Sequence, residues 1–112
     1  MNMDNLISLC AEADVPSDAG FRVDLPGRPP LAVFRVDYAF HVVDDTCTHG
    51  LASLSDGYVE DGTVECPLHA GKFCIKTGTP VDGPVDTPVR VYPSQVVSGR
   101  VCITNEFPRS IE

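Results

Sequence analysis

Two short segments of the chain pair a cysteine with a histidine, and their side chains are the best suited in the sequence to bind a metal. The first segment is Cys47-Thr48-His49-Gly50 and the second is Cys66-Pro67-Leu68-His69. Sixteen residues separate His49 from Cys66, and among them Asp61-Gly62 is a two-residue hairpin signal. Because a hairpin brings its two ends together, we expect both segments to offer their thiolates and imidazoles to one centre.

Two thiolates and two imidazoles suit either a tetrahedral zinc ion or an iron–sulfur cluster, because both accept soft sulfur together with nitrogen. A Cys2His2 zinc finger groups its two cysteines and then its two histidines, whereas this chain interleaves Cys-x-His with Cys-x2-His. The interleaved order is typical of a Rieske [2Fe–2S] centre, in which two cysteines hold one iron and two histidines hold the other. A structural zinc site is the alternative.

The remaining cysteines and histidine offer no second chemistry. We expect Cys74 and Cys102 to be buried, inert thiols, Cys10 to be partly exposed, and His41 to be a hydrogen-bonded structural residue. A mononuclear iron oxygenase site needs two further histidines and a carboxylate, and only His41 is spare. The chain also lacks a glycine-rich dinucleotide fingerprint. We therefore predict no catalytic residues and no enzyme activity of this chain alone.

Frequent turns position these segments. The 112 residues and 12.0 kDa predict one domain, and nine glycines and ten prolines cut it into short pieces, which favours an all-β fold. Ser98-Gly99 is a second hairpin signal, residues 14–19 could form one helical turn, and the proline-rich segment 78–88 is an irregular loop that either connects strands or covers a site. The expected strands are 21–25, 31–36, 39–43, 58–60, 63–65, 72–76, 95–97 and 100–103.

The charge of the chain restricts its partners. A formal net charge of −8 should repel nucleic acid and anionic membranes. The apolar runs are too short for a membrane span, and the first residues lack a signal-peptide pattern, so we expect a cytoplasmic protein. Acidic residues near the two segments form either a solvated face or a docking surface for basic partners: Asp44, Asp45, Asp56, Glu60, Asp61 and Glu65.

The two Cys/His segments resemble the two boxes of Rieske proteins. The stretch 47–93 is similar to the small Rieske [2Fe–2S] ferredoxins of bacterial aromatic ring-hydroxylating dioxygenase systems, and 31–45 fits them more loosely. Residues 52–57 resemble the segment that follows the first box in that family. The pieces that resemble the segment after the second box and the strand after the proline loop are 71–73, 77–78 and 90–93.

This resemblance implies a fold and a ligand set. The fold is a Rieske-type antiparallel β-sandwich, a single domain over 1–112 with a small cluster-binding subdomain at about 45–77 and a proline loop at about 78–88. One [2Fe–2S] cluster would be bound, with Cys47 and Cys66 on one iron and His49 and His69 on the other through Nδ1.

The resemblance also implies a function. The chain would be a soluble, monomeric one-electron carrier between an NAD(P)H-dependent flavoprotein reductase and a terminal aromatic-ring dioxygenase. A Rieske small subunit of another multicomponent oxidoreductase, of the nitrite-reductase type, is an alternative, as is a Cys2His2 zinc interaction domain. High-potential Rieske proteins have bridging cysteines where this chain has Ala52 and Leu68, and hydroxyl groups where it has Gly71 and Phe73. We therefore expect no disulfide and a reduction potential near about −150 mV.

Overall fold

The computed structural model describes residues 6–48, 52–68, 71–82 and 87–104. Short strands and two turns of 3-10 helix, η2 (Glu12–Asp14) and η3 (Leu54–Asp56), make up its regular structure. The strands are β1 (Leu6–Ala11), β2 (Phe21–Val23), β3 (Leu31–Val36), β4 (Ala39–Asp44), β5 (Tyr58–Glu60), β6 (Thr63–Glu65), β7 (Lys72–Cys74), β8 (Pro80–Asp82), β9 (Val91–Tyr92), β10 (Ser94–Val97) and β11 (Arg100–Thr104). In the described part no helix is long and apolar enough to cross a membrane.

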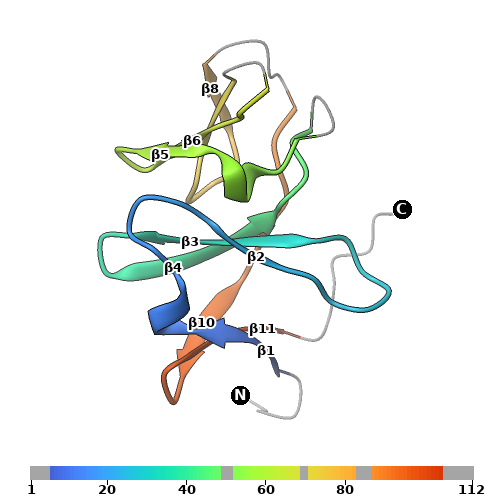
Figure 1. Cartoon of the computed structure of the whole chain (residues 1–112), viewed down its shortest axis with the longest axis vertical. Helices are drawn as coiled ribbons and strands as arrows, with labels where there is room; N and C mark the ends of the chain where they lie inside the picture. Colours follow the sequence, from blue (N-terminus) through green and yellow to red (C-terminus); the bar gives the residue numbers. More distant parts are fainter. Residues whose placement is uncertain (1–5, 49–51, 69–70, 83–86, 105–112) are drawn as a thin grey trace.

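The strands form three antiparallel sheets, with the orders β1-β11-β10, β2-β3-β4-β9 and β5-β6-β7-β8. Figure 1 shows the β2–β3–β4 layer in the middle of the molecule, with the β5–β8 sheet on one side of it and the β1–β11–β10 sheet on the other. The all-β antiparallel fold that the sequence predicted is confirmed.

The middle sheet separates two hydrophobic cores, and the sequence of β3 explains how. Its first four residues are all fully buried, because both faces of this strand are covered. Successive side chains of a strand point to opposite faces. Ala32 and Phe34 accordingly pack in the core shared with β6 and β7, whereas Leu31 and Val33 pack in the core shared with β1 and β11.

Both predicted hairpin turns are present. Asp61 and Gly62 have φ angles of 53° and 78°, and Ser98 and Gly99 have 51° and 80°. Positive φ at both central residues is the requirement of the two-residue turn whose twist matches antiparallel strands. The turns join β5 to β6 and β10 to β11, and the first of them leads the chain from one Cys/His segment towards the other.

Several sequence predictions about the elements differ from the structure, among them the strands expected at 21–25 and 72–76, which end earlier, at Val23 and Cys74. The helical turn at 14–19 is wrong: the turn ends at Asp14, because Pro16 favours an extended conformation of Val15 before it. β1 was not predicted, and its register shifts between Ser8 and Cys10, which breaks a regular alternation. β8 lies inside the predicted irregular loop; its proline is tolerated because β8 is an edge strand.

Candidate metal centre

The first Cys/His segment begins a loop, residues 47–52, that closes at its base. Thr46 and Ser53 face each other there as an isolated antiparallel bridge. One step further in, the backbone N–H of Cys47 donates a 2.9 Å hydrogen bond to the carbonyl of Ala52. Cys47 is therefore the first residue of the first loop. We call the paired residues at the base of each loop its neck, so that Thr46 and Ser53 form the neck of the first loop.

The second Cys/His segment begins a loop, residues 66–71, that closes in the same way. Glu65 and Lys72 pair at its base as the last pair of the β6–β7 ladder. The backbone N–H of Cys66 donates a 2.7 Å hydrogen bond to the carbonyl of Gly71. The two loops thus repeat one arrangement, in which the cysteine takes the first position and its N–H bonds to the carbonyl five residues later.

Both cysteines point into the protein while the residues after them face solvent. Cys47 and Cys66 are 2% and 1% exposed and belong to the same hydrophobic core as Phe73 and Ile75. Thr48, Pro67 and Leu68 are exposed. In both loops the thiol therefore packs against the hydrophobic core, and the next described residue is already at the surface.

His49 and His69 lie outside the described residues, so their placement by the sequence analysis stays a prediction. Among the described residues, no three metal-ligating side chains converge. All five cysteines are described, and none forms a disulfide. Two buried, unbridged cysteines at the starts of matched loops fit a cluster that takes two thiolates from two loops.

The described ends of the proline loop are anchored at both sides of the site. Gly78 donates its N–H to the carbonyl of Cys74 (2.7 Å) and accepts a hydrogen bond from the N–H of Val89 (2.9 Å). The hydroxyl of Thr48 donates to the carbonyl of Thr87 at 2.8 Å. The first loop and the residues that close the proline loop are thus directly connected.

Two acidic residues that the sequence analysis placed near a surface have structural partners instead. Asp45 is completely buried and forms an ion pair with Arg22 (3.2 Å). Asp44 accepts a 2.6 Å hydrogen bond from the hydroxyl of Tyr92. Asp45 therefore cannot belong to a docking surface, and the prediction was wrong for that residue. The alternation of apolar and polar residues along a strand does not reveal buried ion pairs.

Cys102 is buried as predicted, whereas Cys10, Cys74 and His41 differ from expectation. Cys10, predicted to be partly exposed, is buried, whereas Cys74 is half-buried and hydrogen bonds from Thr77 lower the pKa of its thiol. Nε2 of His41 is buried and has no hydrogen-bond partner among the described atoms, so the prediction of a hydrogen-bonded histidine was wrong. Burial, and then the charge of Lys76, lower the pKa of His41.

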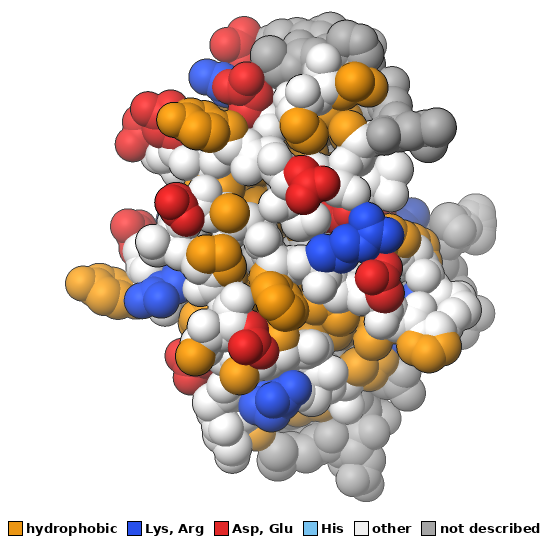
Figure 2. Space-filling model, viewed as in Figure 1, with side chains coloured by type: hydrophobic (Ala, Val, Ile, Leu, Met, Phe, Trp, Pro, Cys, Tyr) orange, Lys and Arg blue, Asp and Glu red, His pale blue; other side chains and the backbone are white. Residues whose placement is uncertain are grey.

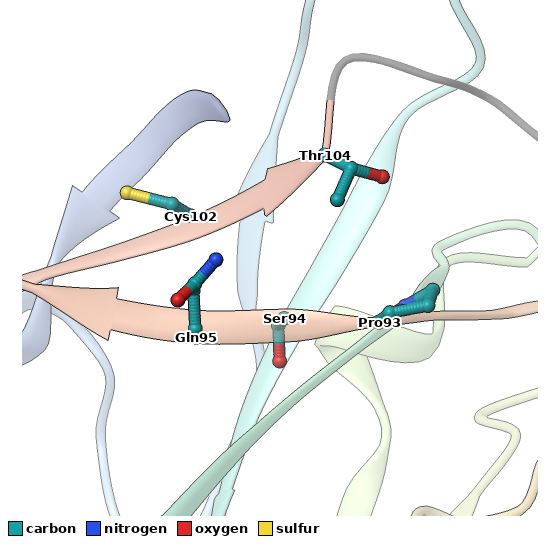
Figure 3. A pocket seen from close by; sticks show the side chains of 5 residues that line it. All are labelled: Pro93, Ser94, Gln95, Cys102 and Thr104. Carbon is teal, nitrogen blue, oxygen red and sulfur yellow. The ribbon is translucent and has the colours of Figure 1, made fainter. Parts of the chain in front are cut away.

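A surface hollow lies on the β10–β11 hairpin (Figure 3), which is on the opposite side of the middle sheet from β5–β8 (Figure 1). Pro93, Ser94, Gln95, Cys102 and Thr104 line it, and its volume is about 260 Å³. Pockets that bind small organic ligands are usually about 300–1,000 Å³. This hollow is therefore not assigned to an organic substrate.

Matched cysteine loops on an all-β scaffold define a small metal-binding β protein. The chain belongs to the Rieske [2Fe-2S] domain family, whose model matches residues 5–93. One Rieske-type [2Fe–2S] cluster is the cofactor of that family.

The chain is similar to ferredoxin components of dioxygenases. It is 45% identical to the 3-phenylpropionate/cinnamic acid dioxygenase ferredoxin subunit of Escherichia coli K12, over 88% of this chain and 92% of that protein. The structure resembles the ferredoxin of Sphingomonas yanoikuyae B1, with a TM-score of 0.86, 40% identity, and coverage of 89% of this chain and 98% of that one. It also resembles the ferredoxin in a complex of reduced oxygenase and oxidized ferredoxin of carbazole 1,9a-dioxygenase (TM-score 0.85, 38% identity, coverage 95% and 98%).

A more distant likeness concerns the alternative of the nitrite-reductase type. The putative NADH-dependent nitrite reductase small subunit of Mycobacterium tuberculosis has a TM-score of 0.78 and 26% identity, and the match covers 92% of this chain and 96% of that one. The higher identities to dioxygenase ferredoxins favour that group.

Proposed function

We propose that this protein is a one-electron carrier that passes electrons from an NAD(P)H-dependent flavoprotein reductase to a terminal aromatic-ring dioxygenase. The observation that carries the proposal is the pair of loops with buried cysteines and exposed following residues. Such loops hold a redox centre on an apolar floor, close to the surface where a partner docks. The similarity to dioxygenase ferredoxin subunits supports the same role.

The proposed ligands are Cys47 and Cys66 for one iron and His49 and His69 for the other. The bound cluster would accept and release one electron at a time. The cluster-binding subdomain would be the part at about 45–77, and the proline loop at about 78–88 would flank the site. The burial of both thiols and their equivalent loop positions support this ligand set.

The proposed partners are a reductase and an oxygenase that approach the carrier in turn. Figure 2 shows Asp and Glu side chains gathered on the side of the molecule where β5 and β6 lie. Asp56, Glu60 and Asp61 are exposed there. A group of negative charges attracts basic partners over a distance and so guides fast, weak encounters with them. We propose that the protein is a monomer, since a shuttle must leave each partner. We also propose that it works in the cytoplasm.

Visible absorption, reduced-state EPR, and iron and sulfide assays on one purified sample test the proposal. A red-brown protein with equal iron and sulfide, and an average g below the free-electron value, is expected. A colourless protein with one zinc would replace the proposal with a structural zinc domain. A stable complex that co-purifies with a larger oxidoreductase would instead favour a fixed subunit, such as that of a nitrite reductase.

The ligand set has its own test. The variant His69→Cys should keep iron and lower the reduction potential below that of the parent, which is expected near about −150 mV, because a thiolate adds negative charge. His41→Cys is the control, since it places the same thiol outside the two loops. An unchanged potential in His69→Cys would contradict the ligand assignment.

A further inference from the structure

We propose that Arg22, Asp45 and Ser53 form a clamp that positions the first loop, and with it Cys47, from the outer strand β2. The inference rests on the proposed function in one respect, namely that Cys47 is a cluster ligand. Arg22 acts through the neck of the loop, so it is a positioning residue.

The geometry of Arg22 shows how one side chain spans the neck. Its Nη1 lies 3.2 Å from Oδ2 of Asp45, and the same nitrogen donates a 2.9 Å hydrogen bond to the hydroxyl oxygen of Ser53. Asp45 directly follows β4 on the segment that enters the first loop, and Ser53 lies on the segment that leaves the loop, directly before η3. The guanidinium therefore joins the two sides of the neck just below the Thr46–Ser53 bridge.

Asp45 joins the two segments by two further hydrogen bonds. Its Oδ1 accepts a 2.8 Å hydrogen bond from the N–H of Ser55, and its carbonyl accepts a 2.7 Å bond from the N–H of Leu54. The residue is completely buried, and a buried carboxylate is costly unless it is paired and hydrogen-bonded. Arg22 therefore supplies the charge that lets Asp45 stay inside the neck.

A fourth residue orients the guanidinium. Nε of Arg22 lies 3.2 Å and 3.3 Å from the two carboxylate oxygens of Asp24. With Nε held there, Nη1 faces Asp45 and Ser53. The guanidinium thus binds Asp24 through Nε and the neck through Nη1 at the same time, and a lysine ammonium cannot reproduce this geometry.

The two loops differ in a way that explains why only the first needs a clamp. The neck of the second loop ends a ladder in which Glu65, Val64 and Thr63 each pair with a residue of β7. Among the described residues, the strand pairing of the first neck is limited to one isolated bridge, beside which lie the backbone hydrogen bonds from Cys47 to Ala52 and from Leu54 to Asp45. In the described part of the first neck, side-chain bonds from Arg22 and Asp45 take the place of that ladder.

The test uses the holoprotein and the variants Arg22→Gln, Arg22→Lys and Arg35→Gln. Arg35→Gln is the matched control, because it removes the same charge from an exposed position on neighbouring β3. Peptide-resolved hydrogen exchange compares residues 44–55 with residues 63–74, so that the second neck serves as an internal reference. Iron release to a chelator and the EPR line shape of the reduced protein are measured on the same samples.

In Arg22→Gln we expect about tenfold faster exchange in the first neck only, since the loss of a hydrogen bond to a charged group shifts an opening equilibrium by about tenfold or more. Iron release should be faster than in the parent and the EPR line shape altered, because Cys47 is held less firmly. Arg22→Lys should recover part of each effect, and Arg35→Gln should match the parent. Parent-like exchange in Arg22→Gln, or an equal increase in both necks, would overturn the clamp. A parent protein without a cluster would refute the proposed function, while the exchange of the first neck would still decide for or against the clamp.

Discussion

The hydroxyl of Tyr92 on β9 donates a 2.6 Å hydrogen bond to Oδ1 of Asp44 at the end of β4. Burial, and then this bond to a carboxylate, raise the pKa of Tyr92 to about 12. Because β4 runs directly into the first loop, the bond fixes the point at which the chain leaves the middle sheet.

We predict that Tyr92→Phe lowers the free energy of unfolding at pH 7 by about 1.5–3 kcal/mol, the usual contribution of a hydrogen bond to a charged group. Chemical denaturation measures the change. Tyr38→Phe, at a side chain that is 96% exposed, is the control and should change little. A loss in Tyr92→Phe no larger than in this control would mean that the bond contributes nothing.

The same residue predicts a dependence on alkaline pH. A tyrosine whose pKa is higher in the folded protein stabilises the fold fully below its unfolded pKa, and loses this contribution as pH rises through the folded value. The stability difference between parent and Tyr92→Phe should therefore shrink from about pH 10 towards pH 12. Denaturation at a series of pH values checks this, and a difference that grows with pH would contradict it.

Gly78 has a φ of +76°, and a Cβ there would collide with the carbonyl oxygen of Val89. Gly27 provides a matched control, since its φ is +72° and no atom lies within 4 Å of an added Cβ. The left-handed conformation alone should cost Gly27→Ala about 1–2 kcal/mol. Gly78→Ala should cost clearly more, because backbone must also move; equal losses in thermal unfolding would show that the contact is easily relieved.

Thr48→Val should release the described end of the proline loop from the first loop, because it removes the donor to the Thr87 carbonyl. The bond is exposed, so we expect a loss of at most about 1 kcal/mol of stability but faster hydrogen exchange near residue 87. Thr48→Ser keeps the donor and should behave like the parent. Equal exchange in both variants would show that the hydroxyl does not hold the loop.

His41 predicts a dependence on acidic pH. Its pKa is lowered by burial, and by Lys76, so protons bind more readily to the unfolded chain, and this histidine destabilises the fold as pH falls below about 6.5. The stability of His41→Phe relative to the parent should therefore increase from pH 7.5 to pH 5.5. A difference that is constant with pH, measured by denaturation, would refute this.

Neutralising Asp56, Glu60 and Asp61 together should slow reduction by the proposed flavoprotein reductase at low salt and weaken the salt dependence of that rate. Asp18→Asn, at an exposed residue outside this group, is the control. Asp44 and Asp45 are left unchanged, because both have structural partners. Unchanged rates in the triple variant would contradict a docking role for these residues and leave them only a role in solubility.

The sequence predicts those parts of the fold that local chemistry dictates. Asp61-Gly62 and Ser98-Gly99 require positive φ, so both hairpins were predicted, and β3 was predicted with the observed bounds. β1 was missed because the register shift between Ser8 and Cys10 interrupts its alternation, and because its described partner, β11, lies far away in the sequence. Strand pairing over such a distance leaves no local pattern.

The candidate site shows the same division. The positions of Cys47 and Cys66 at the starts of loops follow from short motifs after predicted strands. The ion pair of Asp45 with Arg22 joins residues 23 positions apart, and only folding brings them together. The sequence positions of the acidic residues therefore suggested that Asp45 lies at the surface, whereas in the structure it is buried and paired with Arg22.

The pairing of Leu6 with Thr104 places the first and last described strands side by side. Because β1 and β11 are antiparallel, tension on these two residues would open their hydrogen bonds one after another, as a zipper opens. Fraying would thus begin in the β1–β11–β10 sheet, on the opposite side of the middle sheet from β5–β8 (Figure 1). Separation of β1 from β11 would leave the pairing of β5, β6, β7 and β8 in place.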